Sequence, residues 1–299
     1  MSSDTAAAPS ATAPASPQSL PQSLLSALNA AAEDIWMACQ ADWPGLSLEV
    51  HPELDSTNTR LMAQGRQGQC QPTVLVAMSQ TAGRGRRGRS WLGQAGDTLT
   101  CSVGLPLALE HVPGGGHTLS LAVGLALAEA LDGLGALHVP VGLKWPNDLW
   151  VGPRKLGGIL IEVTPAPGLP EPQRWVVIGL GLNVRGQPPN ADAISLWPAA
   201  DAADLAVARV FAHVIPALLH GMARFALSGF APLQPRFAQR DVLMGRTVQL
   251  WGHDAQPGHD AADDEGQCLG VDADGALLVH TAHGLQRWTS GDVSVRPSP

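Results

Sequence analysis

The amino-acid sequence predicts an α+β fold, in which a mixed β-sheet flanked by helices is followed by a small all-β domain. Residues 22–41 and 203–227 place apolar side chains at the spacing of an amphipathic helix. Between them lie apolar runs of strand length, such as residues 175–184. From about residue 241 the helical spacing gives way to short strand-like runs, with a hairpin signal at Asp274-Gly275.

The remaining elements follow from the same periodicities and from turn residues. Asp55 begins a run of capping residues before a short helix that ends at Gly65. Residues 117–134 are mostly apolar and predict a helix buried over a broad face. Strands are predicted over residues 46–50, 73–79, 98–105, 141–145, 157–163 and 175–184, and in the C-terminal part over 246–251, 267–280, 285–288 and 292–296.

Composition and pattern divide the 299 residues into three parts. Residues 1–20 are mostly Ala, Pro and Ser and predict a disordered tail. Residues 21–240 carry the long helices and the strands between them, so they predict the α/β domain. Residues 241–299 predict the β domain.

The overall composition restricts the class of protein. A formal net charge of −8 argues against a protein that coats nucleic acid with a broad basic surface. The four cysteines are scattered without a CxxC pair, which favours reduced thiols and a cytoplasmic location over disulfides or a zinc site. Apolar runs such as Leu119–Ala128 are too short to cross a bilayer, and the N-terminus lacks the features of a signal peptide.

Residues 80–91, QTAGRGRRGRSW, are called the arginine loop here; they carry Arg84, Arg86, Arg87 and Arg89. The interleaved glycines let the backbone approach a ligand, and arginine forks grip phosphates or carboxylates at two points. The loop therefore predicts a site for a polyphosphate or an acyl phosphate. An RNA-binding tract and a plain solvated loop are the alternatives, and Trp91 is the only aromatic residue in the loop to support the first of these.

Both lysines of the chain lie in one segment, LKWPNDLWVGPRKLGGILIEV, although 16 other residues are arginine. A lysine retained in an arginine-rich protein indicates a place for a compact point charge. Lys144 begins KWPND, where Asp148 could hold a magnesium ion or a ribose hydroxyl. Lys155 precedes Gly157-Gly158, which clears space near the backbone. Ordinary turns and a surface lysine remain the alternatives for each motif taken alone.

Two further motifs are ambiguous. GLGLN at residues 179–183 lacks the third glycine and the following helix of a dinucleotide fingerprint, so Asn183 is either a buried polar contact near a ligand or a turn residue. Ser56-Thr57-Asn58 is either a ligand-binding polar group or only a helix cap.

The order of these motifs carries more information than any one of them. DSTN, QTAGRGRRGRSW, KWPNDLW, RKLGGILIEV and GLGLN, followed by a small β module, closely resemble the biotin protein ligases over residues 46–296. The resemblance implies a biotin/lipoate ligase-like catalytic domain and an SH3-like C-terminal β-barrel. It implies an ATP-dependent enzyme that makes biotinyl-5'-AMP with Mg²⁺ and transfers biotin to a lysine of a biotin carboxyl carrier protein, such as that of acetyl-CoA carboxylase.

The resemblance also implies roles for individual residues. Lys155, Arg84 and Arg86 are expected to be catalytic. The biotin-binding residues are expected to be Ser56, Thr57, Asn58, Gln80, Gly83, Arg84, Gly85, Arg86, Lys155 and Gly158. The nucleotide-binding residues are expected to be Trp91, Lys144, Asn147, Asp148 and Asn183, with Asp148 also on Mg²⁺.

Departures and rivals limit what the resemblance implies. Thr81 stands where many relatives have a second glutamine. Some relatives carry an N-terminal DNA-binding domain; fewer than 50 residues precede the catalytic region here, so we expect no DNA binding. A homodimer along a sheet edge is in keeping with the family. The nearest rival is a lipoate ligase or lipoyl transferase, which the polar group Ser56-Thr57-Gln80 disfavours because a plain acyl tail needs an apolar channel.

Overall fold

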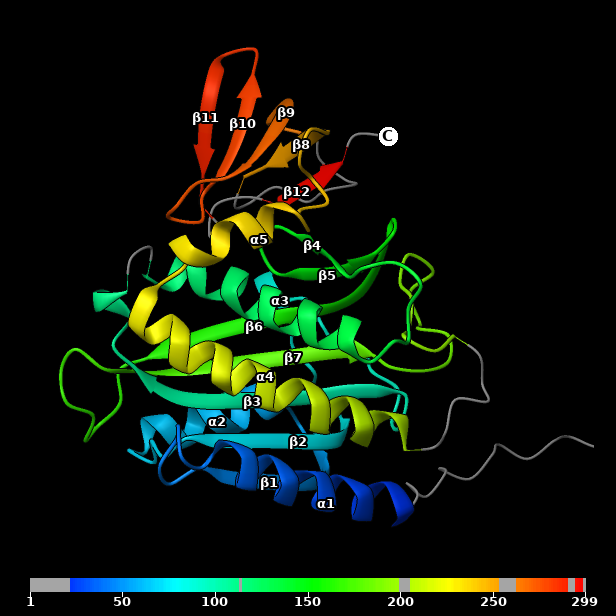
Figure 1. Cartoon of the computed structure of the whole chain (residues 1–299), viewed down its shortest axis with the longest axis vertical. Helices are drawn as coiled ribbons and strands as arrows, with labels where there is room; N and C mark the ends of the chain where they lie inside the picture. The colour runs from blue at the N-terminus through cyan, green and yellow to red at the C-terminus, as the bar shows by residue number, and fades with distance from the viewer. Residues whose placement is uncertain (1–21, 113–114, 199–204, 253–261, 290–293, 298–299) are drawn as a thin grey trace, which may run out of the picture.

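The computed structural model describes residues 22–112, 115–198, 205–252, 262–289 and 294–297, so the predicted disordered tail at 1–20 lies outside the described residues. The α/β domain contains a seven-stranded sheet with the order β1-β2-β3-β7-β6-β5-β4 (Figure 1). Only the β1–β2 pair is parallel, so the sheet is mixed, as predicted. Its strands are β1 (Ser47–Leu54), β2 (Thr73–Gln80), β3 (Thr98–Leu107), β4 (Gly142–Lys144), β5 (Asp148–Val151), β6 (Arg154–Thr164) and β7 (Arg174–Asn183).

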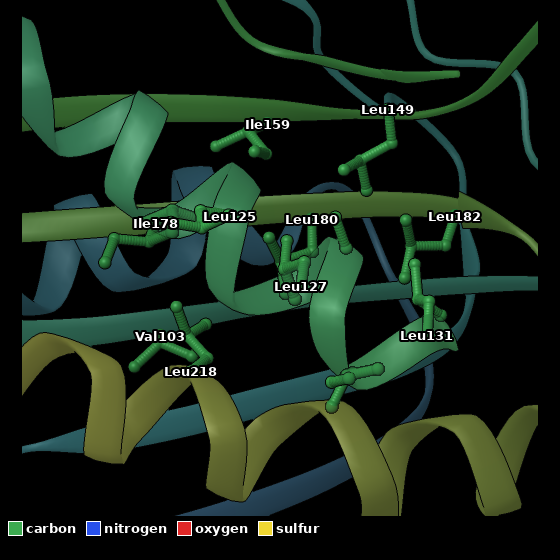
Figure 2. Close-up of a cluster of buried hydrophobic side chains, with 14 of the residues drawn as sticks. Val103, Leu125, Leu127, Leu131, Leu149, Ile159, Ile178, Leu180, Leu182 and Leu218 are labelled. Carbon is green, nitrogen blue, oxygen red and sulfur yellow. The ribbon is translucent and has the colours of Figure 1, made fainter. Parts of the chain in front are cut away.

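Helices cover the two faces of this sheet unequally. The long helices α1 (Gln22–Cys39), α3 (Gly115–Gly133) and α4 (Ala206–Ser228) bury the main apolar core on one face, and α4 packs against both α1 and α3. Figure 1 shows α3 and α4 crossing the front of the sheet. Figure 2 shows Leu125 of α3 beside Ile178 of β7, and Leu218 of α4 beside Val103 of β3. The short helix α2 (Thr57–Arg66) packs on the other face around Trp175.

Strand alternation explains this division. Successive side chains of a strand point to opposite faces, so Ile178, Leu180 and Leu182 of β7 enter the main core. Gly179 and Gly181 lie between them and face the α2 side. The α2 side of β7 is therefore almost flat near the end of the strand, and this leaves room for other side chains.

Helix α4 has the length and mean hydropathy of a membrane span, and among the helices of the described residues it alone passes that test. Its apolar stripe, which includes Phe211, Leu218 and Met222, is fully buried. It packs against α1 and α3 in the main core. The helix is thus arranged like the central helix of a folded domain.

The C-terminal part is all-β, as predicted. Its five strands pair in the order β11-β10-β9-β8-β12, with every pair antiparallel. Gly275, at φ +77°, lies in the predicted hairpin turn between β9 and β10. The strands are β8 (Thr247–Trp251), β9 (Asp264–Val271), β10 (Leu277–Thr281), β11 (Gly284–Trp288) and β12 (Ser294–Pro297).

The two domains are joined through this hairpin. The indole Nε1 of Trp145 donates a hydrogen bond to the carbonyl oxygen of Gly275 at 3.0 Å, and Trp145 is buried. A Cβ on Gly275 would lie 3.0 Å from Thr118 and 3.1 Å from Leu121, so the turn rests directly on α3. The C-terminal sheet is consequently fixed beside the KWPND segment.

Three elements differ from the sequence-based expectations. Strand β1 runs to Leu54 rather than ending at residue 50, because pairing with β2 continues its ladder. The four-residue strand β5 and the five-residue helix α5 (Gln234–Ala238) were not predicted. Both are too short to show a periodic pattern, and β5 forms because the flanking strands β4 and β6 supply its hydrogen bonds.

Candidate active site

A cavity of about 200 Å³ opens on the α2 side of the sheet, beneath the arginine loop. The structure brings together side chains that lie far apart in the sequence, from Ser56 to Arg296. The predicted site residues that line the cavity are Ser56, Thr57, Asn58, Gln80, Arg84, Gly85, Arg86, Trp91, Lys144, Asn147, Asp148, Lys155 and Gly158.

Four polar residues that line the cavity, Ser56, Thr57, Asn58 and Gln80, are called the polar cluster here. Ser56 is the N-cap of α2, and its hydroxyl accepts a hydrogen bond from the Thr59 amide at 3.4 Å. The cap therefore exists, as the structural alternative predicted, and it also turns Thr57 and Asn58 toward the sheet. The Gln80 Oε1 atom at the end of β2 accepts from the Thr57 amide at 2.7 Å.

Three arginines attach the arginine loop to three different parts of the molecule. Arg84 pairs with Glu162 of β6, with an Nη2–Oε1 distance of 3.0 Å. Arg86 donates to the side-chain oxygen of Asn147 at 3.0 Å. Arg87 reaches the carbonyl oxygen of Gly252 in the C-terminal domain at 3.1 Å. The loop thus spans the cavity from β6 to the C-terminal domain.

The loop backbone is tightly folded to make this span. Arg87 has φ +56°, the only positive φ of a non-glycine residue in the described ranges, and Gly88 follows it at φ +68°. The Gly83 carbonyl accepts from the Trp91 amide at 2.9 Å and so pairs the two ends of the loop. A Cβ on Gly83 would lie 2.5 Å from the Trp91 carbonyl oxygen, which explains why glycine is needed there.

Lys155 of β6 and Asp148 of β5 form an ion pair in the cavity, with an Nζ–Oδ1 distance of 2.6 Å. Gly158 lies opposite Asp148 in the β5–β6 ladder, and a Cβ there would approach Lys155 Nζ to 3.2 Å. The space that Gly158 leaves is therefore occupied by the ion pair. Lys155 Nζ also lies 6.0 Å from the centre of the Trp91 ring.

Lys144 lies beside this pair, with its ammonium 5.0 Å from the centre of the Trp150 ring. Burial lowers the pKa of Lys144 to about 8, and the nearby positive charges of Lys155, Arg296 and Arg89 act in the same direction. Asp148 opposes this shift. A cation that is destabilised by burial and by like charges is well suited to receive an anionic ligand.

Two glycines of GLGLN make room for site residues. A Cβ on Gly179 would lie 2.1 Å from the Asn58 side chain, and a Cβ on Gly181 would lie 2.4 Å from the Trp91 indole. The motif is confirmed not to be a dinucleotide fingerprint, because it lies within strand β7. In the sequence, the glycines at alternate positions of this strand are the signal that one of its faces leaves room for other side chains.

Trp91 therefore lies flat on the backbone of β7. Its indole Nε1 is buried, and no described residue accepts its hydrogen bond. A buried donor without a partner costs about 1–3 kcal/mol.

The sequence-based reasoning missed four residues of the site. Ser102 of β3 is fully buried behind the polar cluster, and Glu162 of β6 pairs with Arg84. Val295 and Arg296 of β12 line the cavity from the C-terminal domain. Ser102 and Glu162 are single polar residues in predicted strands, and alternation could have placed them on the Gly179 face. Arg296 carried no local signal.

Gly83 and Asn183 do not line the cavity. Gly83 lies in the arginine loop behind Trp91. Asn183 is buried at the end of β7, where its carbonyl accepts from the Leu196 amide at 3.2 Å. Their predicted contacts with ligands stay predictions.

The residues present fit a magnesium ion that arrives with a nucleotide. Within the described ranges no three His, Cys, Asp or Glu side chains are grouped to hold a metal. Mg²⁺ bound mainly by phosphate oxygens and water needs only one or two protein carboxylates, and Asp148 supplies one in the cavity. Asn147 adds a side-chain oxygen beside it, although that oxygen already accepts from Arg86.

Comparison with known proteins identifies the family. Residues 50–183 match the biotin/lipoate A/B protein ligase family, and residues 258–296 match the biotin protein ligase C-terminal domain. The bifunctional ligase/repressor BirA of Escherichia coli is 34% identical over 84% of this chain and 75% of that protein. The biotin–[acetyl-CoA-carboxylase] ligase of Paracoccus denitrificans is 30% identical over 78% of this chain and 93% of that protein.

Solved structures agree with the sequence comparison. The biotin protein ligase from Aquifex aeolicus in complex with biotin and ATP has a TM-score of 0.65 and 27% identity, and covers 84% of this chain and 99% of that chain. The agreement extends over both the mixed sheet and the C-terminal sheet. The chain belongs to the biotin protein ligase family.

Proposed function

We propose that this protein is a biotin–[biotin carboxyl carrier protein] ligase. It activates biotin with ATP to biotinyl-5'-AMP and pyrophosphate, and then transfers biotin to a lysine of the carrier domain of acetyl-CoA carboxylase or a related carboxylase. Residues 21–240 form its catalytic domain and residues 241–299 its C-terminal domain. The observation that supports this best is one cavity with a polar cluster, the Lys155–Asp148 pair and the closed arginine loop around it.

The polar cluster is suited to the ureido ring of biotin. A ureido group presents N–H donors and a carbonyl acceptor, and Ser56, Thr57 and Gln80 offer neutral hydroxyl and amide groups. A lipoyl ring has no such groups, so it would leave unmet the hydrogen-bonding capacity that Ser56 and Thr57 keep beyond their contacts within the protein. This favours biotin over lipoate, the rival substrate. Asn58 stays a predicted biotin residue, although its amide is already hydrogen-bonded within the protein.

Charge in the cavity matches the first half-reaction. A carboxylate oxygen of biotin attacks the α-phosphorus of ATP, the bond to the β-phosphate oxygen breaks, and pyrophosphate leaves. Lys155, Arg84 and Arg86 are the residues we assign to this step, because cations there offset negative charge that gathers on the α-phosphate. Trp91, Lys144, Asn147 and Asp148 form the nucleotide side. Mg²⁺ bound to the phosphates would offset part of their charge, and Asp148 would hold it.

The second half-reaction needs the loop to keep the mixed anhydride from water. The carrier's lysine amine attacks the biotinyl carbonyl carbon, and AMP leaves with the electrons of the broken C–O bond. The arginine loop spans the cavity and is attached at both sides, which is the arrangement that protects a reactive intermediate. A cytoplasmic location, a homodimer, and the absence of DNA and membrane binding stay predictions.

ATP–pyrophosphate exchange with magnesium, measured with biotin and with lipoate in parallel, tests the proposal. Exchange that requires biotin is the expected result. Exchange with lipoate alone would show that the enzyme activates lipoate and not biotin. No exchange with either substrate would contradict the proposed ligase activity and would leave the arginine loop as a binding element only.

A further inference from the structure

A continuous chain of hydrogen bonds runs beneath the cavity from the polar cluster to the arginine loop. Thr57 Oγ1 lies 2.7 Å from Ser102 Oγ, and Ser102 Oγ donates to Asn58 Oδ1 at 2.6 Å. Asn58 Nδ2 donates to Glu162 Oε2 at 2.9 Å. Arg84 then donates to the same carboxylate at 3.0 Å. Thr57, Ser102 and Asn58 are buried, so water does not replace the contacts among these three residues.

The carboxylate of Glu162 fixes the direction of this chain. A carboxylate paired with an arginine can only accept hydrogen bonds, so Asn58 must turn its Nδ2 toward Glu162. The Leu160 carbonyl, 3.3 Å from the same Nδ2, requires the same orientation. Asn58 Oδ1 therefore faces Ser102, and Ser102 must donate its only hydroxyl proton to it.

This direction determines what Thr57 offers to a ligand. Because Ser102 has given its proton to Asn58, the proton in the Thr57–Ser102 contact comes from Thr57. Gln80 Oε1, 3.1 Å from Thr57 Oγ1, is satisfied by the Thr57 amide instead. Thr57 Oγ1 is left with lone pairs and no proton to give, so on the cavity side it is an acceptor. That matches an N–H donor on the ligand.

We propose that Glu162 is a positioning residue that sets the hydrogen-bond direction of the polar cluster and fastens the arginine loop to it through Arg84. The part concerning the biotin N–H rests on the proposed function. Gly179 is required for the same chain of hydrogen bonds, since any side chain there would displace Asn58. Glu162 thereby acts on the substrate through Asn58, Ser102 and Thr57 without touching it.

The variant Glu162→Gln separates these roles. Its amide can donate to Asn58, so only the longer contact with the Leu160 carbonyl still holds the original Asn58 orientation. The chain can then reverse, and in the reversed chain Thr57 has a proton to offer toward the ligand. We expect the KM for biotin in ATP–pyrophosphate exchange to rise about tenfold while kcat changes about twofold or less. Trypsin should cleave the ligand-free arginine loop about fivefold faster, because the ion pair between Arg84 and residue 162 is reduced to a hydrogen bond with a neutral amide.

Two further variants make the test specific. Glu129→Gln removes the partner of Arg236 on the opposite side of the sheet and serves as the matched control, with KM and loop cleavage unchanged. Ser102→Ala breaks the chain between Glu162 and Thr57. In that background Glu162→Gln should no longer change the KM for biotin, but should still speed loop cleavage.

An unchanged KM and unchanged cleavage in Glu162→Gln would overturn the proposal. If the KM effect of Glu162→Gln simply adds to that of Ser102→Ala, Glu162 does not act on Thr57 through Ser102. Only its role in fastening the arginine loop would then remain. Loop cleavage is measured without ligand, so it still tests Glu162 if the wild-type protein shows no biotin-dependent exchange; the absence of exchange would count against the proposed function alone.

Discussion

The two faces of strand β7 differ in what they bury. Toward α3 and α4, Ile178, Leu180 and Leu182 fill the main core, whereas toward α2 the intervening positions are Gly179 and Gly181. Those glycines receive Asn58 and Trp91 from other elements. One face of the strand therefore stabilises the fold, and the other face leaves room for the side chains of the site. The two roles stay separate because successive residues of a strand point to opposite faces.

The comparison predicts that substitutions on the core face act on stability. Replacing Ile178, which is fully buried, by alanine removes apolar contacts and leaves a cavity under α3 and α4. We expect Ile178→Ala to lower the free energy of unfolding by about 3 kcal/mol. Urea denaturation measures this change, and exchange activity per folded molecule at low temperature should stay near the wild-type value. Loss of activity in fully folded protein would break the comparison.

On the site face, even the change from glycine to alanine should reduce activity while it leaves stability nearly unchanged. The methyl group of Gly181→Ala would lie 2.4 Å from the Trp91 indole and must displace it, together with the end of the arginine loop. We expect biotin-dependent ATP–pyrophosphate exchange to fall about a hundredfold, because small misplacements of binding groups are costly to rate. The unfolding midpoint should move far less than in Ile178→Ala. Near-normal exchange would show that Trp91 has no part in the reaction.

Buried charges inside and outside the site sharpen the comparison. Lys144 lies in the cavity, and burial lowers its pKa to about 8. A phosphate bound beside it should raise that pKa again, so ATP binding should take up protons above pH 8 and weaken by up to about tenfold per pH unit. Calorimetry in buffers of different ionisation enthalpy detects the uptake. Lys144→Met should bind ATP more weakly and without proton uptake. If the variant still takes up protons, a group other than Lys144 binds them.

Asp241 is the buried charge outside the cavity, at the junction of the two domains. Burial raises its pKa from 3.8 to about 6, and its Oδ2 is buried with no partner among the described residues. The folded state thus holds a proton more tightly than the unfolded state, so the penalty of the charged form acts above pH 6 and is relieved as pH falls through 6 toward 4.

The corresponding variant should have the smallest effect of the four. Asp241→Asn removes the charge, and the amide oxygen can still accept from the Leu243 amide. We expect it to raise the free energy of unfolding at pH 7.5 by about 1 kcal/mol and to flatten its rise between pH 6 and pH 4. Unfolding titrations at several pH values measure this. Equal pH dependence in variant and wild type would place the titrating group elsewhere.

The sequence was most informative where the chemistry is local. The arginine loop, KWPND and the two lysines could be assigned to a site because each concentrates unusual residue types in a few positions. The helices and most strands were predictable from their periodicity, and the short β5 and α5 were not because they depend on neighbouring elements.

The supporting residues were harder to predict because their roles depend on pairing across the sheet. Ser102 and Glu162 come together only when β3, β7 and β6 are adjacent. The ligand contact of Asn183 stays a prediction; its carbonyl accepts from the Leu196 amide, and the residue is not among those that line the cavity. Arg296 reaches the cavity only through the docking of the C-terminal sheet, which rests on the Trp145–Gly275 hydrogen bond.

A crystal structure of the protein with biotin and ATP tests the central claim most directly. The account predicts the ureido ring against Thr57 and Gln80 on the α2 side of β7, with the activated carboxylate at Lys155 beneath the arginine loop. Ligand bound instead in the groove between α3 and α4, beside His220 and Arg236, would contradict it. So would a biotin ring seated away from the polar cluster with Thr57 facing only protein.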